Sequence, residues 1–365
     1  MSGSVFGNHI HVSTFGESHG KALGAVIDGF PAGMKLSEDD LIPYMNRRRP
    51  GSAYISTSRQ EEDVPEILSG VFDGMTTGTP IAILVRNTSA RSSDYDALKE
   101  VYRPGHADYT YAVKYGIRDY RGGGRSSGRE TIGRVLAGAM SAKLLKELGI
   151  DIFAYTKSIG SIEINPSRFD RSLILRTRTA MPDRDADEKA VQLIKKASAA
   201  GDSLGGVVEI KMQGIPAGLG EPVFHKLDAS LAQALMSIGA VKAVEVGDGT
   251  AVSACRGTDN NDCFRFENGQ ISKITNHAGG ILGGISDGSE IVCRCHFKPT
   301  PSVSASQETV SASGENLTLN IKGRHDPVIV PRAVVVAESM CHIVILDALL
   351  GHMSTRISDI KNFYN

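Results

Sequence analysis

The sequence predicts an α+β fold in a single large domain covering residues 1–365, and three observations favour it. Strand-like and helix-like segments come in uneven groups, not in the regular alternation of a doubly wound parallel sheet. No linker, tandem repeat or low-complexity tract divides the chain. Hydrophobic residues make up 41% of the sequence and are spread along its whole length, so a sizeable core is expected.

Four strands are expected from short apolar runs bounded by Gly, Pro or Thr. They span residues 67–72, 81–85, 207–212 and 291–297. In the last run Cys293 and Cys295 fall on the apolar face, whereas His296 takes the opposite face. The Cys-x-Cys-His run is therefore not expected to bind a metal, and no second pair at zinc spacing accompanies it.

Four helices are expected from apolar residues at i, i+3 and i+4 spacing. The clearest spans residues 128–148, where Ser127 and Glu130 predict a capping box and Gly149 a stop. A second spans residues 185–200, and a third spans residues 228–238, with Asp228 as its N-cap.

The fourth helix, residues 333–350, is the most apolar stretch of the chain. Pro331 suits its first turn and Gly351 its end. Polar residues at 338, 342 and 347 make it too polar for a membrane span. It is expected to lie in the core or at a subunit interface.

Charge and cysteine content narrow the class of protein. The net charge is −1, so no overall field attracts nucleic acid or an anionic membrane, and neither partner is expected. Five cysteines form no disulfide framework, which favours a reducing compartment. The first residues show no export signal, and a cytoplasmic location is expected.

The segment 118–130 has the strongest chemical signature. Three consecutive glycines let backbone N–H groups converge, two serines add hydroxyl donors, and the loop runs into a helix N-terminus. Residues 103–134 hold seven Lys and Arg against three Asp and Glu. We expect a ligand with more than one phosphate. One alternative is a solvent-exposed turn that binds no ligand. A second is an RGG-type nucleic-acid segment, which is disfavoured because the motif occurs once and leads into an amphipathic helix.

Two histidines lie in Gly-rich loops. Residues 14–21 resemble a Walker A loop but are one residue short and lack its Ser or Thr, so a P-loop is rejected. His19 in this loop and His106 in the segment 103–108 are candidates for proton transfer, because imidazole titrates near neutrality. A single histidine is more often structural, but two in such loops are better candidates.

Four further basic or Gly-rich loops could contact a ligand or be ordinary turns. They are residues 47–49, 276–284, 298–302 and 322–327. The first could equally be a charge cluster at a helix C-terminus.

Nine segments, in order over almost the whole chain, together resemble the chorismate synthase family. They are TFGESHG (14–20), RRRPG (47–51), SGVFDGMTTGTPI (69–81), RPGHADYTYAVKYGIRDYRGGGRSSGRE (103–130), GDSLGG (201–206), PAGLGEPVFHKLDA (216–229), NHAGGILGG (276–284), KPTPS (298–302) and GRHDP (323–327). The resemblance implies anti-1,4-elimination of phosphate from 5-enolpyruvylshikimate 3-phosphate to give chorismate, the last common step of aromatic amino acid biosynthesis. It also implies dependence on reduced FMN, and a homotetramer with helices sandwiched between antiparallel β-sheets.

The resemblance also implies roles for individual residues. His19 would protonate the leaving phosphate, and His106 would keep the reduced flavin correctly protonated. Asp326 with Ser127 would assist flavin N5 in taking the C6 proton. The FMN contacts would be Arg125, Ser126, Ser127, Gly239, Ala240, Gly283, Lys298, Pro299, Thr300, Pro301, Ser302 and Arg324. Arg48 matches a basic position that contacts phosphate or NADPH, and the candidates for substrate contact are Arg134 and Arg332.

Three positions depart from the family pattern. Gly239 stands where Asn is common, Tyr54 where a basic residue is frequent, and Pro301 where Ser is usual. None of these changes removes a proposed proton donor. A non-catalytic flavin-binding or anion-binding protein is the alternative function, and the intact His19, His106 and Asp326 argue against it. Whether NADPH serves as reductant stays open at this point.

Overall fold

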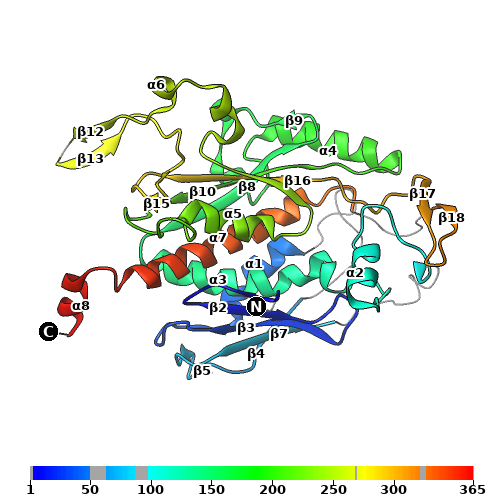
Figure 1. Cartoon of the computed structure of the whole chain (residues 1–365), viewed down its shortest axis with the longest axis horizontal. Coiled ribbons are helices and arrows are strands. Elements are labelled where there is room, and N and C mark those ends of the chain that lie inside the picture. The colour runs from blue at the N-terminus through cyan, green and yellow to red at the C-terminus, as the bar shows by residue number, and fades with distance from the viewer. Residues whose placement is uncertain (1–2, 50–62, 88–97, 268, 321–325, 365) are drawn as a thin grey trace.

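A computed structural model describes residues 3–49, 63–87, 98–267, 269–320 and 326–364. Two five-stranded antiparallel sheets enclose a layer of helices (Figure 1). The first sheet has the order β1 (Val5–Phe6), β2 (His11–Phe15), β3 (Ala22–Asp28), β7 (Ile81–Arg86), β4 (Pro65–Ile67). The second has the order β11 (Val241–Val246), β16 (Ile291–Phe297), β10 (Gly206–Gln213), β8 (Asp151–Ile159), β9 (Ile162–Glu163). The expected α+β class with antiparallel sheets is confirmed.

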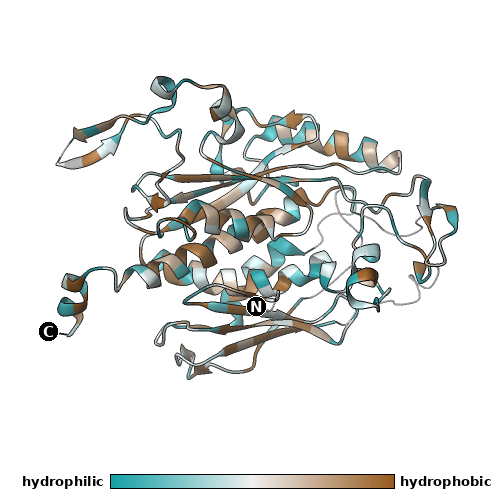
Figure 2. Cartoon of the chain, in the orientation of Figure 1, coloured by the Kyte–Doolittle hydropathy of each residue, from teal (hydrophilic) through white to brown (hydrophobic). Residues whose placement is uncertain are grey.

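The helix layer consists of α1 (Glu38–Arg48), α3 (Thr131–Glu147), α5 (Leu227–Met236) and α7 (Val330–His352). Helix α7 lies at its centre and contacts the other three helices as well as β8 and β10. The expectation that this stretch is too polar for a membrane span is wrong by length and composition alone, but most of the helix is buried inside the protein. Figure 2 shows it as a mostly hydrophobic ribbon within the helix layer. The helix was expected in the core or at a subunit interface, and in this chain it lies in the core.

Helices α3 and α7 approach each other closely because α3 carries glycine at the crossing. A Cβ built at Gly138 would lie 2.2 Å from the Cβ of Ser339 on α7. Real side chains cannot approach so closely, so only glycine allows this crossing.

The remaining elements surround this body. The outer helices are α2 (Asp108–Tyr115), α4 (Arg184–Ala199), α6 (Gly257–Asn260) and α8 (Ile357–Tyr364). The hairpins are β5 (Val71–Phe72) with β6 (Met75–Thr76), β12 (Phe264–Glu267) with β13 (Gln270–Lys273), β14 (Ile281–Leu282) with β15 (Ile285–Ser286), and β17 (Gln307–Val310) with β18 (Asn316–Leu319). Single 3₁₀ turns are η2 (Gly124–Ser126), η3 (Gly128–Glu130), η4 (Pro166–Arg168), η5 (Arg171–Leu173) and η6 (Gly249–Ala254).

Several expected elements are confirmed. The strands expected at 81–85, 207–212 and 291–297 are β7, β10 and β16, and the helix expected at 185–200 is α4. Burial alternates along β16: Cys293 and Cys295 are fully buried, and His296 on the other face lies 3.3 Å from Glu245 Oε2. The described residues contain no group of three or more His, Cys, Asp or Glu side chains that could hold a metal.

The prediction of a single strand over residues 67–72 is wrong. Strand β4 ends at Ile67 and β5 begins at Val71. Gly70 between them has φ +77°, and a Cβ there would lie 2.5 Å from Ile81 Cγ1. The chain turns sharply at this glycine, which an uninterrupted strand does not allow.

Three helix ends differ from the prediction. Helix α3 begins at Thr131, because residues 128–130 form η3. The Ser127 side chain accepts the N–H of Arg129 at 3.3 Å, as a capping residue does. Glu130 instead pairs with Arg134 at 3.0 Å, so the predicted capping box is not formed. Helix α5 begins at Leu227, so Asp228 lies in its first turn and is not the N-cap. Helix α7 continues through Gly351 to His352, because the last turn packs against the core at position 350.

Candidate functional site

His19 lies in the loop after β2, and a neighbouring loop supports its ring. Ser18 Oγ is 3.0 Å from His19 Nδ1. A Cβ built at Gly122 would lie 2.6 Å from both Nδ1 and Cε1 of His19, so the glycine backbone packs directly on the imidazole. Gly122 has φ +75°, a conformation that glycine adopts without strain. The Gly-rich loop 118–130 therefore fixes where His19 can sit.

Arg125 joins the same two loops. Its Nη2 donates to Thr14 Oγ1 at 2.6 Å, and its Nη1 donates to the Gly16 carbonyl at 3.1 Å. Ser126 Oγ donates to the Gly123 carbonyl at 2.6 Å, which closes the turn η2. The guanidinium expected to contact FMN thus holds the loop that carries His19 against the Gly-rich loop.

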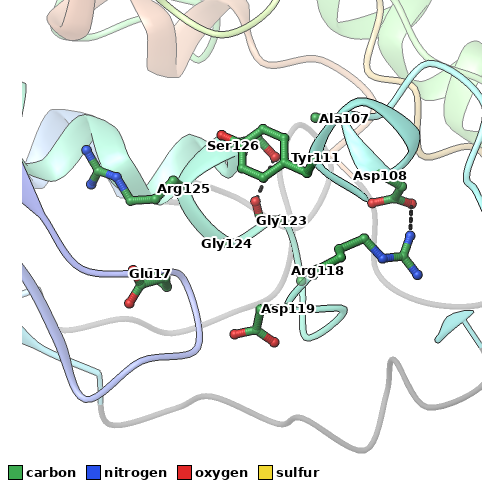
Figure 3. Close-up of a pocket in the computed structure, with 11 residues that line it drawn as sticks. Glu17, Ala107, Asp108, Tyr111, Arg118, Asp119, Gly123, Gly124, Arg125 and Ser126 are labelled. Carbon is green, nitrogen blue, oxygen red and sulfur yellow. Dashed lines mark hydrogen bonds and ion pairs between the residues drawn. The ribbon is translucent and has the colours of Figure 1, made fainter. Parts of the chain in front are cut away.

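A small cavity of about 120 Å³ lies beside the Gly-rich loop (Figure 3). It is lined by Glu17, Ala107, Asp108, Tyr111, Arg118, Asp119 and residues 122–126. Asp108 is paired with Arg103 at 2.7 Å and with Arg118 at 3.2 Å. Burial alone would raise the pKa of Asp108, but these guanidinium groups outweigh burial and lower it. The cavity holds only a few water molecules and is too small for a cofactor by itself.

His106 meets the loop that follows β16. Its Nε2 lies 2.8 Å from Ser302 Oγ. Lys298 in the same loop donates from Nζ to the Gly105 carbonyl at 2.8 Å and from its backbone N–H to the Ala240 carbonyl at 3.0 Å. Partial burial, with Lys242 nearby, lowers the pKa of Lys298. Three segments that are distant in sequence, 105–106, 239–240 and 298–302, are thereby brought together.

The hydroxyl of Thr300 is a buried polar atom for which the described residues supply no hydrogen-bond partner. Buried hydroxyls are normally hydrogen-bonded, and an orphaned one at a loop rich in donors indicates a ligand. A phosphate fits here, because Lys298 and Ser302, two residues before and two residues after Thr300, add an ammonium group and a hydroxyl to the same loop. The donor set of this loop therefore fits a phosphorylated cofactor.

A second centre is an arginine cluster, defined here as Arg48, Arg129 and Arg332 with Asp63 and Asp326. Arg48, at the end of α1, is 2% exposed and is ion-paired with Asp63. Arg129 Nη2 lies 3.0 Å from the other oxygen of Asp63. Arg332 on α7 pairs with Asp326 at 2.7 Å and donates from Nε to the Arg48 carbonyl at 3.0 Å.

The cluster is rich in guanidinium groups. The ion pairs given above join three of them to two carboxylates. Burial lowers the pKa of Arg48 most, and Arg332 adds to this, while Asp63 opposes both. Burial alone would raise the pKa of Asp63, but Arg48 and Arg129 outweigh burial, so this pKa is lowered. Guanidinium groups held in fixed positions bind phosphate and carboxylate groups well, so the cluster is suited to receive an anion.

Asn87 connects this cluster to the His19 loop. Its Nδ2 donates to the carbonyls of Glu17 and Gly20, at 3.2 and 2.8 Å, while its Oδ1 accepts from Arg129 Nη2 at 2.7 Å. Sequence reasoning missed Asn87 and Asp63, whose local sequence carries no ligand signature. Arg129 was counted in the basic run but not singled out, and its place two residues after Ser127 was the available signal.

Other expected site residues lie further from these contacts. Arg134 pairs with Glu130 and donates to Ser237 Oγ at 2.6 Å, so it joins α3 to the end of α5 near Gly239. A Cβ at Gly239 would meet open space, so the glycine in place of Asn leaves room rather than a clash. Ser127 Oγ accepts the Arg129 N–H, beside the cluster.

Gly283 is not brought to the other loops within this chain. The next residue, Gly284, accepts the N–H of Leu227 at the start of α5, whereas Gly239 and Ala240 follow the end of that helix. Ten residues of α-helix, about 15 Å, separate the two places. Arg324 and Tyr54 lie outside the described residues, and the loop 322–327 is described only from Asp326.

The chain is similar to proteins of one family over its whole length. A family model described as chorismate synthase matches residues 10–350. Curated relatives with that name include one from Lachnoclostridium phytofermentans, 55% identical with 100% of both chains covered, and one from Methanosarcina mazei, 52% identical with 96% of this chain and 97% of the relative covered. A solved structure described as "Crystal Structure of Chorismate Synthase" matches with a TM-score of 0.76 and 31% identity, covering 98% of this chain and 97% of that one.

Proposed function

The chain belongs to the chorismate synthase family, and from this membership we propose how its own residues carry out the reaction. The enzyme is a phosphate-eliminating lyase of the shikimate pathway and acts in aromatic amino acid biosynthesis, with 5-enolpyruvylshikimate 3-phosphate as substrate and reduced FMN as cofactor. The observation that supports the residue roles is a continuous set of contacts. His19 packs on Gly122, whose carbonyl accepts from Arg103, and the Arg103 carbonyl accepts the N–H of His106. Asn87 joins the His19 loop to Arg129 of the arginine cluster. The whole described chain acts as one catalytic domain.

The arginine cluster binds the anionic substrate. The substrate carries a phosphate and two carboxylates, and the guanidinium groups of Arg48, Arg129 and Arg332 can bind such anionic groups. The guanidinium groups are already held by Asp63 and Asp326, so little reorganisation is needed when the anion enters. Arg134, beside the end of α5, stays a further candidate for substrate contact.

His19 donates the proton that the leaving phosphate takes. When the Ser18 hydroxyl donates to Nδ1, the neutral ring carries its proton on Nε2, and the protonated ring carries one on each nitrogen. The packing of Gly122 on the ring limits its movement. A fixed donor is required because proton transfer depends on close and aligned approach.

The loops that meet at His106 would hold the cofactor. Lys298, Thr300 and Ser302 would bind its phosphate together with Ser126, while Arg125 holds the Gly-rich loop in place. Pro299, Pro301, Gly239, Ala240 and Arg324 complete the contacts that we carry over from the family. When bound, reduced FMN supplies electron density to the substrate and a basic N5 for the C6 proton.

His106 and Asp326 control protons near the flavin. His106 is held through Nε2 by Ser302, which fixes the ring beside the loop that we assign to the cofactor. Asp326, oriented by its ion pair with Arg332, assists proton removal together with Ser127. Two separate groups are needed because phosphate departure and C6 deprotonation occur at different positions of the substrate.

The test of His19 is phosphate release in the presence of reduced FMN. His19→Ala should lower turnover by about 10²–10⁴-fold, the usual range for a general acid. His11→Ala, on the exposed end of β2, is the matched control and should match the parent. Parental turnover of the His19 variant would show that this histidine is structural.

The test of the cofactor site is FMN affinity, measured by quenching of flavin fluorescence. Thr300→Val keeps the shape of the side chain and removes the buried hydroxyl, so the dissociation constant should rise about tenfold. Thr318→Val, on the exposed hairpin β17–β18, is the control. Unchanged affinity in the Thr300 variant would remove this hydroxyl from the cofactor site.

We propose NADPH as the reductant of the bound flavin. The support is the resemblance of the position of Arg48 to a basic family position that contacts phosphate or NADPH; in this chain Arg48 is buried in the arginine cluster, and we assign it to the substrate. Anaerobic turnover with NADPH and oxidised FMN as the only additions is the expected result. Turnover only after chemical reduction of FMN would contradict it.

We also propose that the enzyme is a homotetramer in the cytoplasm. The hairpin β12–β13 and helix α8 project from the body (Figure 1) and expose large apolar side chains, Phe266 at 75% and Tyr364 at 80% among them. An isolated hairpin and an eight-residue helix are marginal in water, so a second copy that covers them would stabilise both. Gly283 could then join a flavin site of another subunit. The five free thiols suit a reducing compartment.

Sedimentation tests the assembly. The parent protein should sediment as a tetramer at micromolar concentration, and Phe266→Ser should shift it toward smaller species. The control Phe72→Ser changes an equally exposed phenylalanine on a different hairpin. A parent protein that is monomeric at this concentration would contradict the proposal.

A further inference from the structure

Two consecutive arginines at the end of α1 serve different parts of the molecule. Arg48 enters the arginine cluster, where it pairs with Asp63. Arg47 instead turns into the helix layer and pairs with Glu338 on α7. Successive helical residues point about 100° apart, so holding one of these side chains restricts the direction of the other.

The contact between Arg47 and Glu338 is a bidentate ion pair. Nη1 and Nη2 of Arg47 lie 2.6 and 2.8 Å from the two carboxylate oxygens. Glu338 is 4% exposed and also accepts the N–H of Ala154 on β8 at 3.0 Å. Paired donors in a fork fix the orientation of a guanidinium as well as its position.

Helix α7 holds the end of α1 at two points. Besides the pair with Glu338, Arg332 on α7 donates to the Arg48 carbonyl. These two residues are six positions apart on one rigid helix, about 9 Å along its axis. Two anchors at that separation set both the position and the rotation of the last turn of α1.

The last turn of α1 needs such anchors because the helix is weakened internally. Pro43 lies inside α1 and cannot donate the hydrogen bond to the preceding turn. Beyond Arg49 the next residue that the structure describes is Asp63. Among the described residues, α7 connects this turn to the core through Glu338 and Arg332.

We propose that Glu338 is a positioning residue for substrate binding, acting through Arg47 to place Arg48 in the arginine cluster. The inference rests on the proposed role of Arg48 toward the substrate phosphate. Glu338 itself contacts Arg47 and the backbone of β8 in the core, and it acts on the substrate only through Arg48.

A double-mutant cycle separates positioning from a general structural role. Affinity for 5-enolpyruvylshikimate 3-phosphate is measured by calorimetry on enzyme loaded with oxidised FMN, which permits no turnover. Arg48→Met should weaken binding about 10–100-fold, and Glu338→Gln should weaken it about tenfold. Because both changes act on one interaction, the double variant should bind no more than about twofold worse than Arg48→Met alone.

Glu209→Gln is the matched control. Glu209 is also a buried glutamate with an arginine partner, Arg294 Nε at 2.6 Å, but it lies on the face of β10 turned away from the helix layer. Its substitution should leave substrate affinity at the parental value. If it weakens binding as much as Glu338→Gln does, loss of stability is the cause and the inference is overturned.

Two further outcomes would overturn the inference. The first is an unchanged substrate affinity in Glu338→Gln. The second is a loss of affinity in the double variant that equals the product of the losses in the two single variants. If Arg48→Met itself binds like the parent, the proposed role of Arg48 fails as well, which distinguishes the two failures. Should Glu338→Gln not fold, the pair Arg47→Met with Glu338→Leu replaces it, since apolar residues of similar volume often substitute for buried ion pairs. That variant should fold and show the same loss of affinity.

Discussion

Replacing Gly122 by alanine should impair the enzyme although glycine has no side chain that could react. The added Cβ would lie 2.6 Å from His19 Nδ1 and Cε1 and 2.8 Å from Ser18 Oγ. Carbon atoms in contact are normally about 3.5–4.0 Å apart, so the imidazole must move by about 1 Å. A displacement of this size from a productive geometry costs about 10²-fold in turnover.

The substitution also strains the backbone, and this second effect can be measured separately. Gly122 has φ +75°, which costs a residue with a Cβ about 1–2 kcal/mol. Gly116, the C-cap of α2, has φ +69° and nothing within 4 Å of a built Cβ. Gly116→Ala should therefore lose similar stability in urea unfolding while keeping parental turnover.

The assay is phosphate release under anaerobic conditions with reduced FMN. The expected result is a loss of about 10²-fold in Gly122→Ala with a stability change close to that of Gly116→Ala. Parental turnover in Gly122→Ala would refute the reasoning that the glycine backbone sets the position of His19. Equal losses of turnover in both variants would attribute the effect to backbone strain alone.

Three further predictions concern stability. Gly138→Ala should destabilise the protein by about 1–3 kcal/mol in urea unfolding, because its Cβ would overlap Ser339 on α7; an unchanged midpoint would contradict the close crossing of α3 and α7. Burial by itself would raise the pKa of Asp262, but the N–H groups of residues 277–278 and the Thr275 hydroxyl outweigh it and hold that pKa at about 2. Because the pKa of Asp262 in the folded protein lies below its ordinary value of 3.8, the ionised carboxylate adds roughly 2 kcal/mol to the free energy of unfolding above about pH 4. This contribution is lost as the pH falls toward 2. In Asp262→Asn the free energy of unfolding should therefore depend less on pH between about pH 4 and 2 than it does in the parent. Asp347→Ala should cost about 3–5 kcal/mol, since its carboxylate accepts the N–H groups of residues 8–10 at 2.6–3.2 Å, and a loss below about 1 kcal/mol would show that β2 is held by other contacts.

Elements with a strong period were predictable, and those that depend on distant contacts were not. The alternation of residues 291–297 predicted β16 to the residue, because only one face of that strand meets the core. The run 67–72 looked equally strand-like but is divided at Gly70, where the chain must pass close to Ile81. The predicted start of α5 is wrong because Asp228, although a good capping residue, lies two residues after the actual N-cap, Lys226.

The candidate site was predictable in composition but not in geometry. Gly-rich and basic segments mark loops that bind anions, so His19, His106 and the loop 298–302 could be singled out from local sequence. Asp63 and Asn87 carry no such local mark, and their importance comes from reaching Arg129 and the His19 loop across the fold. Arg125 was expected to face the cofactor, and its hydrogen bonds to Thr14 and Gly16 are contacts between segments that no local pattern reveals.

What the sequence determined by itself is the set of local preferences: the periods of strands and helices, the glycines that allow close approach, and the positive charge that the ligand must balance. Only the tertiary structure decided which of two adjacent arginines faces the site. Arg47 and Arg48 have the same chemistry and the same local surroundings, so propensity cannot distinguish them. Helix α7 distinguishes them, because Glu338 in the core can pair with only one of the two guanidinium groups while the other is left to reach Asp63. That choice depends on the packing of chain segments almost 300 positions apart, which no local pattern encodes.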